Sequence, residues 1–376
     1  MPHLLPIFVG CAALIVCIAA LYVKSTGRDQ KIKLLLYPLL EKAALTQKKN
    51  ILLGRLDGCI DGELYGWAVN PKEPSIAPKL TLCVENRPIA EVLPVQYRPD
   101  VGKHAFYFDL SRFCMPKQRI DAKFSDGRLL PNSPLIASAP ASFARPIETV
   151  LFMHIAKTAG TAFREVIAEN YKQSEIAYLY PDPPGLLTYK LELLPEEQRR
   201  GFRLVIGHFQ YGVHNLFPQE CKYVTIVREP VARVISHYRY ILEKQDRGSA
   251  IKMDSAAALI EMLERRDTVN LDNLMVRCFA GIDEKDVPPG QINEEVYALA
   301  VYHLETDFSF VGYQERASEA YTALQQRFHW KPRAALENVN KGRFSGKQKY
   351  ESGRAAIEHF NCWDCRLYAH IRQLFP

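Results

Sequence analysis

The chain has 376 residues, of which 48% are hydrophobic, and this is enough to bury the cores of two modest domains. Its formal net charge of +6 fits an anionic cofactor or substrate, and we expect no nucleic-acid partner. The nine cysteines follow no regular spacing, which argues against a disulfide-stapled scaffold and favours a reducing compartment.

The first predicted element is an apolar run at residues 4–23. It carries no charged side chain and is long enough to cross a bilayer as a helix. A cleaved signal peptide is the alternative, but it needs a basic segment before the run, where only His3 and the terminal amine stand. Basic residues follow the run, and the positive-inside rule then predicts a single span with the rest of the chain in the cytoplasm. We expect an anchor at 1–24 and a juxtamembrane helix or linker at 25–53.

The pattern of apolar and polar residues changes at residues 54–137. Runs at 80–85, 105–110 and 120–125 alternate apolar and polar residues and are separated by turn residues. Short strands at this spacing predict a small antiparallel β-sandwich. Residues 138–146, rich in Ala, Ser and Pro, predict a linker to a second domain at 147–376.

The most informative stretch opens this second domain. A strand-like run at 149–155 meets a loop of small and hydroxyl residues with Lys157 at its base, and a helical pattern follows from Ala162 to Asn170. Such a loop points backbone N–H groups and a helix N-terminus at one spot, which is an anion site. It is not a Walker A loop, because the lysine precedes the glycine. The residues expected to hold the anion are Lys157, Thr158, Ala159, Gly160, Thr161 and Ala162.

A second strand, turn and helix follow at 223–240. Pro230 suits the first turn of the helix, and the apolar residues after it fall on one helical face. Arg228 ends the strand and Ser236 lies two turns into the helix. Both side chains can converge on a second phosphate group, the arginine as a bidentate fork and the serine as a hydroxyl donor.

Together these two motifs resemble the signature of carbohydrate sulfotransferases that use 3′-phosphoadenosine 5′-phosphosulfate (PAPS), of the heparan-sulfate 2-O/6-O and bacterial type. Residues 154–161 resemble their 5′-phosphosulfate loop, and residues 228–238 resemble their 3′-phosphate motif. Further blocks follow in the expected order at 206–209, 272–281 and 310–315. The resemblance covers roughly residues 147–376. Three departures are Ala156 for proline, Ala159 for glycine and Glu229 for aspartate; Ala159 matters most, because glycine permits a backbone angle that alanine resists.

The resemblance implies a P-loop-NTPase-like parallel sheet with flanking helices, without a bound metal. Strands at 149–155, 203–207 and 223–227 and helices near 254–266, 292–304, 315–328 and 353–374 agree with this class. Transfer of a sulfuryl group depends on positioning and charge stabilisation. Lys157 is expected to stabilise the leaving phosphate and His208, just after a strand, to act as general base. Arg228 and Ser236 bind the 3′-phosphate, and a late basic turn adds Lys341 and Arg343.

Three further histidines allow other interpretations. His214 is a candidate for substrate binding, with a packed structural histidine as the equal alternative. His154 lies within the strand and is expected to be a satisfied core histidine. His237 follows Ser236 and is interpreted as structural, on another face of the helix.

The β-sandwich segment resembles a module attached to bacterial glycan-modifying enzymes, through short motifs near Gly58, Trp67, Arg98, Tyr107 and Pro134. In the favoured interpretation the β-sandwich segment serves as a spacer. In the alternative interpretation it contacts carbohydrate.

We therefore expect a membrane-anchored O-sulfotransferase that acts on a glycan or glycolipid. The orientation suits a bacterial inner membrane with a cytoplasmic catalytic domain, and a Golgi-type lumenal enzyme is the alternative. A nucleotide-dependent kinase and a catalytically silent glycan-binding scaffold are the competing functions. The sugar, the position of sulfation and the oligomeric state are not encoded in these motifs.

Overall fold

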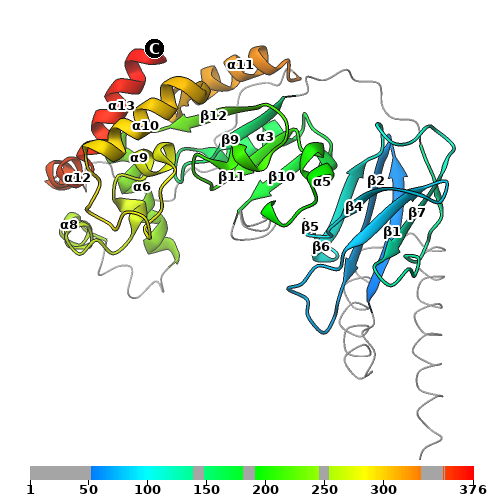
Figure 1. Ribbon diagram of the computed structural model, residues 1–376. Coiled ribbons are helices and arrows are strands. Elements are labelled where there is room, and N and C mark those ends of the chain that lie inside the picture. The colour runs from blue at the N-terminus through cyan, green and yellow to red at the C-terminus, as the bar shows by residue number, and fades with distance from the viewer. Residues whose placement is uncertain (1–51, 139–147, 181–190, 245–253, 332–349, 351) are drawn as a thin grey trace, which may run out of the picture. The chain divides into compact units, whose positions relative to one another are not determined.

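The computed structural model describes residues 52–138, 148–180, 191–244, 254–331, 350 and 352–376 (Figure 1). The predicted anchor at 1–24 lies outside these ranges, as do nearly all of 25–53 and 138–146. No helix within the described ranges is long and apolar enough to span a bilayer. The chain divides into two compact units, and the shorter one is built from the residues before 139 together with Leu193–Gly201.

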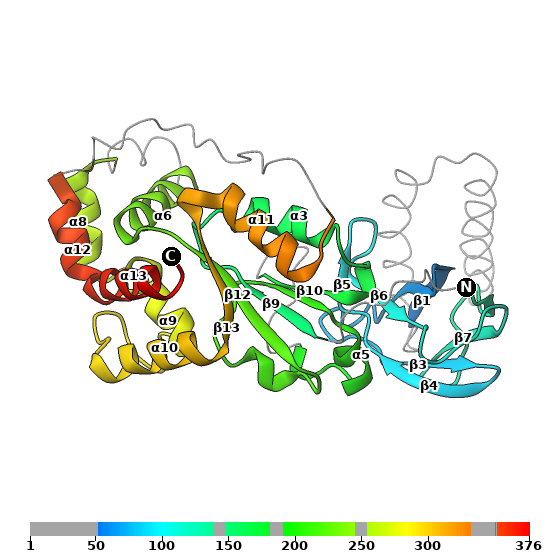
Figure 2. The same cartoon turned by 90° about the horizontal axis from the view of Figure 1, so that it is seen from above.

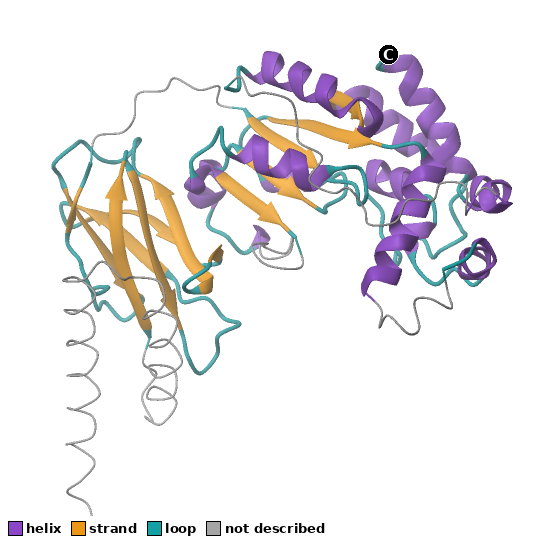
Figure 3. Ribbon diagram, turned by 180° about the vertical axis from the view of Figure 1, so that it is seen from behind, coloured by secondary structure: helices purple, strands orange, loops and turns teal. Residues whose placement is uncertain are grey.

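The first unit consists of two antiparallel four-stranded sheets (Figure 3). One sheet has the order β1-β2-β6-β5 and the other β4-β3-β7-β8. Alternating residues of both sheets, such as Leu56, Phe106 and Ile120, turn inward and share one apolar core. The runs predicted as strands at 80–85, 105–110 and 120–125 correspond to β3, β6 and β7. The strands are β1 (Leu53–Ile60), β2 (Glu63–Val69), β3 (Leu80–Val84), β4 (Arg87–Val92), β5 (Gln96–Arg98), β6 (Gly102–Asp109), β7 (Arg119–Phe124) and β8 (Leu135–Ile136).

A late segment of the chain belongs to this first unit. Helix α5 (Glu196–Gly201) carries Gln198, whose side-chain oxygen accepts from the Leu93 N–H at 2.9 Å and whose amide donates to the Leu93 carbonyl at 3.1 Å. A side-chain amide thus binds the backbone that follows β4 as another strand would. Nothing in the residue pattern of 193–201 pointed to this pairing.

The second unit is built on a five-stranded parallel sheet in the order β10-β11-β9-β12-β13. Its strands are β9 (Thr149–Met153), β10 (Ile176–Leu179), β11 (Leu204–Gly207), β12 (Cys221–Val227) and β13 (Phe308–Tyr313). The three predicted strands are β9, β11 and β12, and they are adjacent in the sheet. The edge strands β10 and β13 were missed as strands; β13 follows helix α10 directly, without a turn signal. The predicted parallel α/β sheet is confirmed.

Helices pack on this sheet and on one another (Figure 2). Helices α3 (Gly160–Ala168) and α11 (Ala317–Phe328) cover one face, where Phe163 and Tyr321 join the side chains of β9, β11 and β12 in one core. A second core holds α6 (Pro230–Lys244), α8 (Ala256–Glu264) and α12 (Arg354–Phe360). The remaining helices are α9 (Leu274–Ala280), α10 (Glu294–Asp307) and α13 (Cys362–Leu374), with single 3₁₀ turns at Gln173–Glu175, Val213–Leu216, Val269–Leu271 and Gln314–Arg316.

The helix predicted at 353–374 is two helices, α12 and α13, divided at Asn361. The side chain of Asn361 is fully buried and accepts a hydrogen bond from the Asn273 N–H at 2.9 Å. Because this amide binds the start of α9, the backbone at Asn361 leaves helical geometry. A buried tertiary contact therefore overrides a helical pattern that is continuous in sequence.

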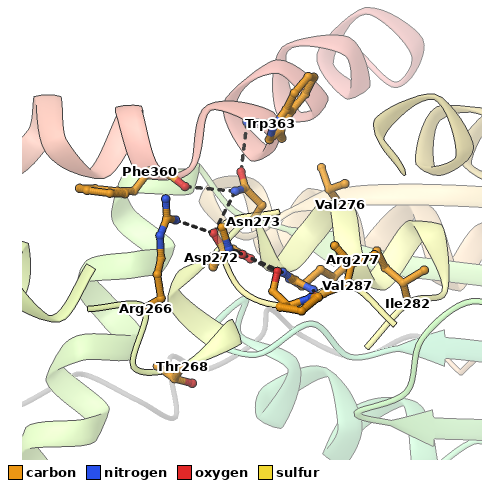
Figure 4. A network of polar contacts seen from close by, with 12 residues as sticks. Arg266, Thr268, Asp272, Asn273, Val276, Arg277, Ile282, Val287, Phe360 and Trp363 are labelled. Carbon is orange, nitrogen blue, oxygen red and sulfur yellow. Dashed lines mark hydrogen bonds and ion pairs between the residues drawn. The ribbon is translucent and has the colours of Figure 1, made fainter. Parts of the chain in front are cut away.

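The block at 272–281 is a buried polar network around the start of α9 (Figure 4). One carboxylate oxygen of Asp272 accepts from Arg277 at 2.8 Å and the other accepts from Arg266 at 2.8 Å. Asn273 donates to the Phe360 carbonyl and accepts from the Trp363 N–H, so the network ties α9 to α12 and α13. Asp272 and Arg277 are 2% and 1% exposed, and each is held by several partners. This block fixes the carboxyl-terminal helices.

Candidate active site

Three loops meet at one edge of the parallel sheet. Strands β9, β11 and β12 are neighbours and run in the same direction, so the residues that follow them all emerge at their carboxyl ends. The loop after β9 carries Lys157, the residue after β11 is His208, and the residue after β12 is Arg228. The sheet therefore brings together the predicted anion loop, the predicted base and one predicted phosphate ligand.

The loop between β9 and α3 has the geometry of an anion cradle. Lys157 and Ala159 both adopt positive φ angles, of 72° and 68°. The backbone N–H groups from Lys157 to Thr161 donate to no other group in the described part of the chain. Alternation between right- and left-handed backbone conformations turns successive N–H groups toward one point, and the amino terminus of α3 adds its dipole. The expected backbone strain at Ala159 is thus present in the structure.

Two residues stabilise this loop from within. The Thr158 hydroxyl is buried and donates to the Ile155 carbonyl at 2.8 Å. Gly160 packs against the ring of His154 so closely that an added Cβ would lie 1.9 Å from a ring carbon. The glycine is therefore required by this contact and not by its backbone angle. The Thr158 hydroxyl therefore has its partner inside the loop.

Arg228 connects the end of β12 to this loop. Its Nη1 donates to the Lys157 carbonyl at 3.2 Å, while its Nε is buried and has no hydrogen-bond partner in the described part of the chain. Burial lowers the pKa of this guanidinium from its ordinary value. Glu229, next in sequence, accepts from the N–H groups of Val231 and Ala232 and so caps α6, the role that the shorter aspartate would have. Arg228 thus keeps donor capacity for an anion beside the loop.

Helix α6 presents a second polar face to the loop. The Lys157 Nζ lies 4.6 Å from the centre of the Tyr240 ring. Ser236 is one helical turn before Tyr240 and therefore on the same face of α6. Burial lowers the pKa of Lys157, and the nearby carboxylate of Glu243 opposes that shift. Ser236 and Lys157 thus lie on facing surfaces of α6 and the loop.

His237 corrects an expectation from the sequence. It is 7% exposed, its Nδ1 has no hydrogen-bond partner among the described residues, and its pKa is lowered to about 4. Burial is the largest cause, followed by the charges of Arg233, Lys157 and His208. The His237 ring lies 6.0 Å from the Tyr240 ring, which the Lys157 ammonium contacts. His237 is therefore on the side of α6 that faces the candidate site, although the sequence suggested another face.

His208 has the geometry of a general base. Its Nδ1 lies 2.7 Å from the His154 carbonyl oxygen, an atom that can only accept, so Nδ1 carries the proton and Nε2 keeps its lone pair. Part of His208 is exposed to solvent. Packing of the rest of the residue against its neighbours removes water from the imidazole and lowers its pKa, and the hydrogen bond to His154 opposes this shift. The imidazole is therefore neutral at pH 7. Gly207 allows this placement, because an added Cβ would lie 2.0 Å from the Leu179 carbonyl oxygen.

His154 packs against His208, with ring centres 4.4 Å apart. Its Nδ1 lies 2.9 Å from the Tyr180 hydroxyl, the ring is 8% exposed, and burial lowers its pKa well below the ordinary value. This agrees with its interpretation as a satisfied core histidine. Its carbonyl nevertheless orients His208, so the residue contributes to the site through its backbone.

Comparison with known protein families identifies the second unit. The family described as galactose-3-O-sulfotransferase matches residues 119–375, which is more than half of the chain. The chain belongs to the galactose-3-O-sulfotransferase family. No curated protein matches the chain closely enough to add to this. The matched region starts in β7 and includes the whole five-stranded sheet with the residues at its edge. The family is one of carbohydrate sulfotransferases, as expected; the heparan-sulfate and bacterial subtypes stay predictions.

Arg164 was missed by the sequence analysis. It lies in the second turn of α3, and its guanidinium carbon is 5.4 Å from the centre of the Tyr180 ring. The Tyr180 ring in turn packs edge-on against His208, with ring centres 5.0 Å apart. The only signal in the sequence was its position three residues after Thr161, which places it one turn into the helix that starts at the loop.

Other predicted residues lie apart from this edge. The His214 Nδ1 is 3.0 Å from the Tyr223 hydroxyl, and Tyr223 is near the start of β12, four residues before its carboxyl end. The structure thus places His214 with a tyrosine cluster and not beside His208. Lys341 and Arg343 lie outside the described residues. Within the galactose-3-O-sulfotransferase match, the residues that the structure does bring together are Lys157, His208 and Arg228, with Ser236 on the facing helix.

Proposed function

We propose that this protein transfers a sulfuryl group from PAPS to a hydroxyl group of a galactose-containing glycan or glycolipid. One observation carries the proposal: two sets of unused hydrogen-bond donors lie at the same edge of the sheet. The N–H groups of residues 157–161 form one set, and the buried Nε of Arg228 belongs to the other. The Arg228–Lys157 bond joins them. A donor with phosphate groups at both ends of its ribose matches two linked anion sites.

The donor would be held by the loop at its phosphosulfate and by Arg228 and Ser236 at its 3′-phosphate, and it supplies the sulfuryl group. Lys157 stands at the base of the loop, where its ammonium group stabilises negative charge on the departing phosphate. Such preorganised charge is typically worth 10²–10³-fold in rate (about 2.7–4 kcal/mol). The Arg228 guanidinium holds the far end and fixes the register of the donor on the loop.

His208 accepts the proton of the attacking hydroxyl group at Nε2. Its Nδ1–H remains bound to the His154 carbonyl, so the ring cannot turn and the imidazolium that forms is stabilised by that oxygen. The hydroxyl group thereby gains nucleophilic character as it attacks sulfur. This use of His208 follows from its tautomer and lowered pKa, and it assigns the acceptor to the side of the site near β11.

A ligand-binding experiment on the full chain tests the proposal. Thermal unfolding is followed with adenosine 3′,5′-bisphosphate and, separately, with ATP and magnesium. At 100 times Kd a ligand stabilises by about 2.7 kcal/mol, or roughly 5–11 °C for a domain of this size, at about 2–4 °C for each kcal/mol. We expect a shift with the bisphosphate that Arg228→Ala abolishes. Arg265→Ala is the matched control, because Arg265 is an exposed arginine paired with Asp267 on the surface.

Each other outcome selects a competing function. A shift with ATP and magnesium alone favours the nucleotide-dependent kinase. No shift with either ligand favours a catalytically silent glycan-binding protein. Incubation with PAPS and a β-galactoside then tests turnover directly, and we expect sulfated sugar and bisphosphate to form in equal amounts.

A further inference from the structure

A positive charge stands beside the candidate base, on the helix that follows the donor loop. The guanidinium of Arg164 lies over the ring of Tyr180, and the edge of that ring contacts His208. One aromatic ring therefore separates the charge from the imidazole. The three side chains come from α3, the end of β10 and the end of β11, so their spacing is set by the sheet and by the helix that packs on it.

This charge has little compensation in the described part of the chain. Among the described residues its ion-pair partner is Glu165, with Nη2 and Oε1 3.9 Å apart, and the Glu165 side chain is itself 52% exposed. No hydrogen bond from the Arg164 guanidinium joins it to any described residue. The charge also lowers the pKa of His154 and of His208, after the larger effect of burial. A cation that weakens a neighbouring base costs activity unless the reaction uses it.

The strand order shows which reactant is near this charge. The sheet runs β10-β11-β9-β12, with Arg228 after β12, the anion loop after β9 and His208 after β11. The donor therefore lies across β9 and β12, and the acceptor hydroxyl group must approach the free Nε2 of His208. Tyr180 follows β10, one strand farther along than His208, and the guanidinium that Arg164 extends from α3 lies over its ring. They are placed to contact the acceptor and not the donor.

We infer that Arg164 binds an acidic group on the acceptor, so that the preferred substrate is a galactoside that also carries a carboxylate, sulfate or phosphate group near the reacting sugar. This inference rests on the proposed function. Guanidinium groups bind such oxyanions in a bidentate way, and hydrogen bonds to charged groups are worth about 10- to 100-fold in affinity. A bound acid also neutralises the charge beside His208 and so restores the basicity of the imidazole. Recognition of the acceptor and activation of the base are thereby coupled.

Three matched acceptors test the inference with the full chain. Each is a disaccharide with terminal β-galactose, and its second sugar is glucose, glucuronic acid or glucose 6-phosphate. With PAPS at saturation and at pH 8, we expect kcat/KM to be about 10- to 100-fold higher for the two acidic acceptors. The ratio between them distinguishes a carboxylate from a phosphate ligand. Arg164→Gln is expected to abolish the preference, and Arg164→Lys to retain part of it. Arg265→Gln is the control for loss of a surface arginine.

The outcomes separate the inference from the proposed function. Equal kcat/KM for all three acceptors in the wild-type chain overturns the inference alone. An equal loss for all three in Arg164→Gln also overturns it, since that result indicates a structural role. The bisphosphate-induced thermal shift shows whether the variant still folds and binds the donor. No PAPS-dependent turnover of any galactoside overturns the proposed function and the inference together.

Discussion

Two parts of the second unit contain buried polar side chains, and they differ in how fully those side chains are bonded. Around Asp272 each charged group has its partners: Arg277 donates to the Asp272 side chain and backbone and to the carbonyls of Val287 and Pro288. At the edge of the sheet the opposite holds. The Nε of Arg228, the Nδ1 of His237 and the N–H groups of the anion loop have no partner among the described residues. Both regions were identified as family blocks from the sequence.

This difference distinguishes a structural motif from a binding motif. An unpaired buried donor costs about 1–3 kcal/mol, which favours a ligand that supplies the partner. The Asp272 network needs no ligand and fixes helices α9, α12 and α13. For the loop and Arg228 we propose that the bound donor supplies the partners. Variants in the two regions should therefore fail in different ways, one through stability and the other through binding and turnover.

The largest effect is expected at His208. His208→Ala removes the base while leaving the anion loop and Arg228 intact, and turnover should fall by about 10²–10⁴-fold. Affinity for adenosine 3′,5′-bisphosphate should stay within about twofold. The pH profile supplies a second test. The base must be neutral and its pKa is lowered in the free enzyme, so kcat/KM should fall only as the pH drops below 6.5 and through that pKa. A profile with no acid limb, or a large loss of bisphosphate binding, would contradict the assignment.

Asp272→Asn should act through stability. The change keeps the shape of the side chain but leaves Arg277, 1% exposed, as a buried charge without its carboxylate. Breaking a buried pair in this way costs about 3–5 kcal/mol of unfolding free energy. Asp267→Asn is the matched control, because Asp267 pairs with the exposed Arg265 and should cost less than about 1 kcal/mol. Denaturant unfolding measures both. Equal losses of unfolding free energy in the two variants would contradict the proposed difference between the two regions. Weaker bisphosphate binding by folded Asp272→Asn would also contradict it.

The sequence predicted the elements whose signals are local. Short patterns predicted strands β9, β11 and β12, the loop after β9 and Pro230 at the start of α6. They also predicted that Lys157 and Arg228 follow neighbouring strands. Features that depend on distant residues were not predictable. The break at Asn361 depends on a bond to Asn273, the burial of Arg233 depends on Asp364, and the proximity of Arg164 to His208 depends on Tyr180 from an unpredicted edge strand. Periodicity shows which face of a helix is apolar, but not which polar residue on that helix meets a loop from elsewhere, as His237 does.

His237 connects the two kinds of region, because it is buried like the network and unbonded like the site. Its pKa of about 4 lies below the ordinary value of 6.5, so between these pH values the unfolded chain binds a proton that the folded chain does not. The stability linked to this group is fully present above pH 6.5 and is lost as the pH falls toward 4, by roughly 3 kcal/mol. His237→Gln should flatten this part of the pH dependence of unfolding, while His154 and His208 remain in both proteins. Identical slopes for the wild type and the variant would show that His237 is not buried in its neutral form.

The smallest effect concerns the strain stored in the anion loop. Ala159 has φ of 68° and ψ of 15°, a left-handed conformation that glycine adopts without the Cβ clash. Asn273 in the Asp272 network is also left-handed, but asparagine tolerates that region better than alanine. Ala159→Gly should therefore raise the free energy of unfolding by about 0.5–1 kcal/mol, after the greater flexibility of glycine in the unfolded chain is subtracted. Ala162→Gly, three residues later in the first turn of α3, should lower it by about the same amount. Opposite shifts in the urea midpoints of the two variants, with equal m-values, would show that the loop holds Ala159 in a backbone conformation that alanine disfavours. Shifts of the same sign would show that it does not.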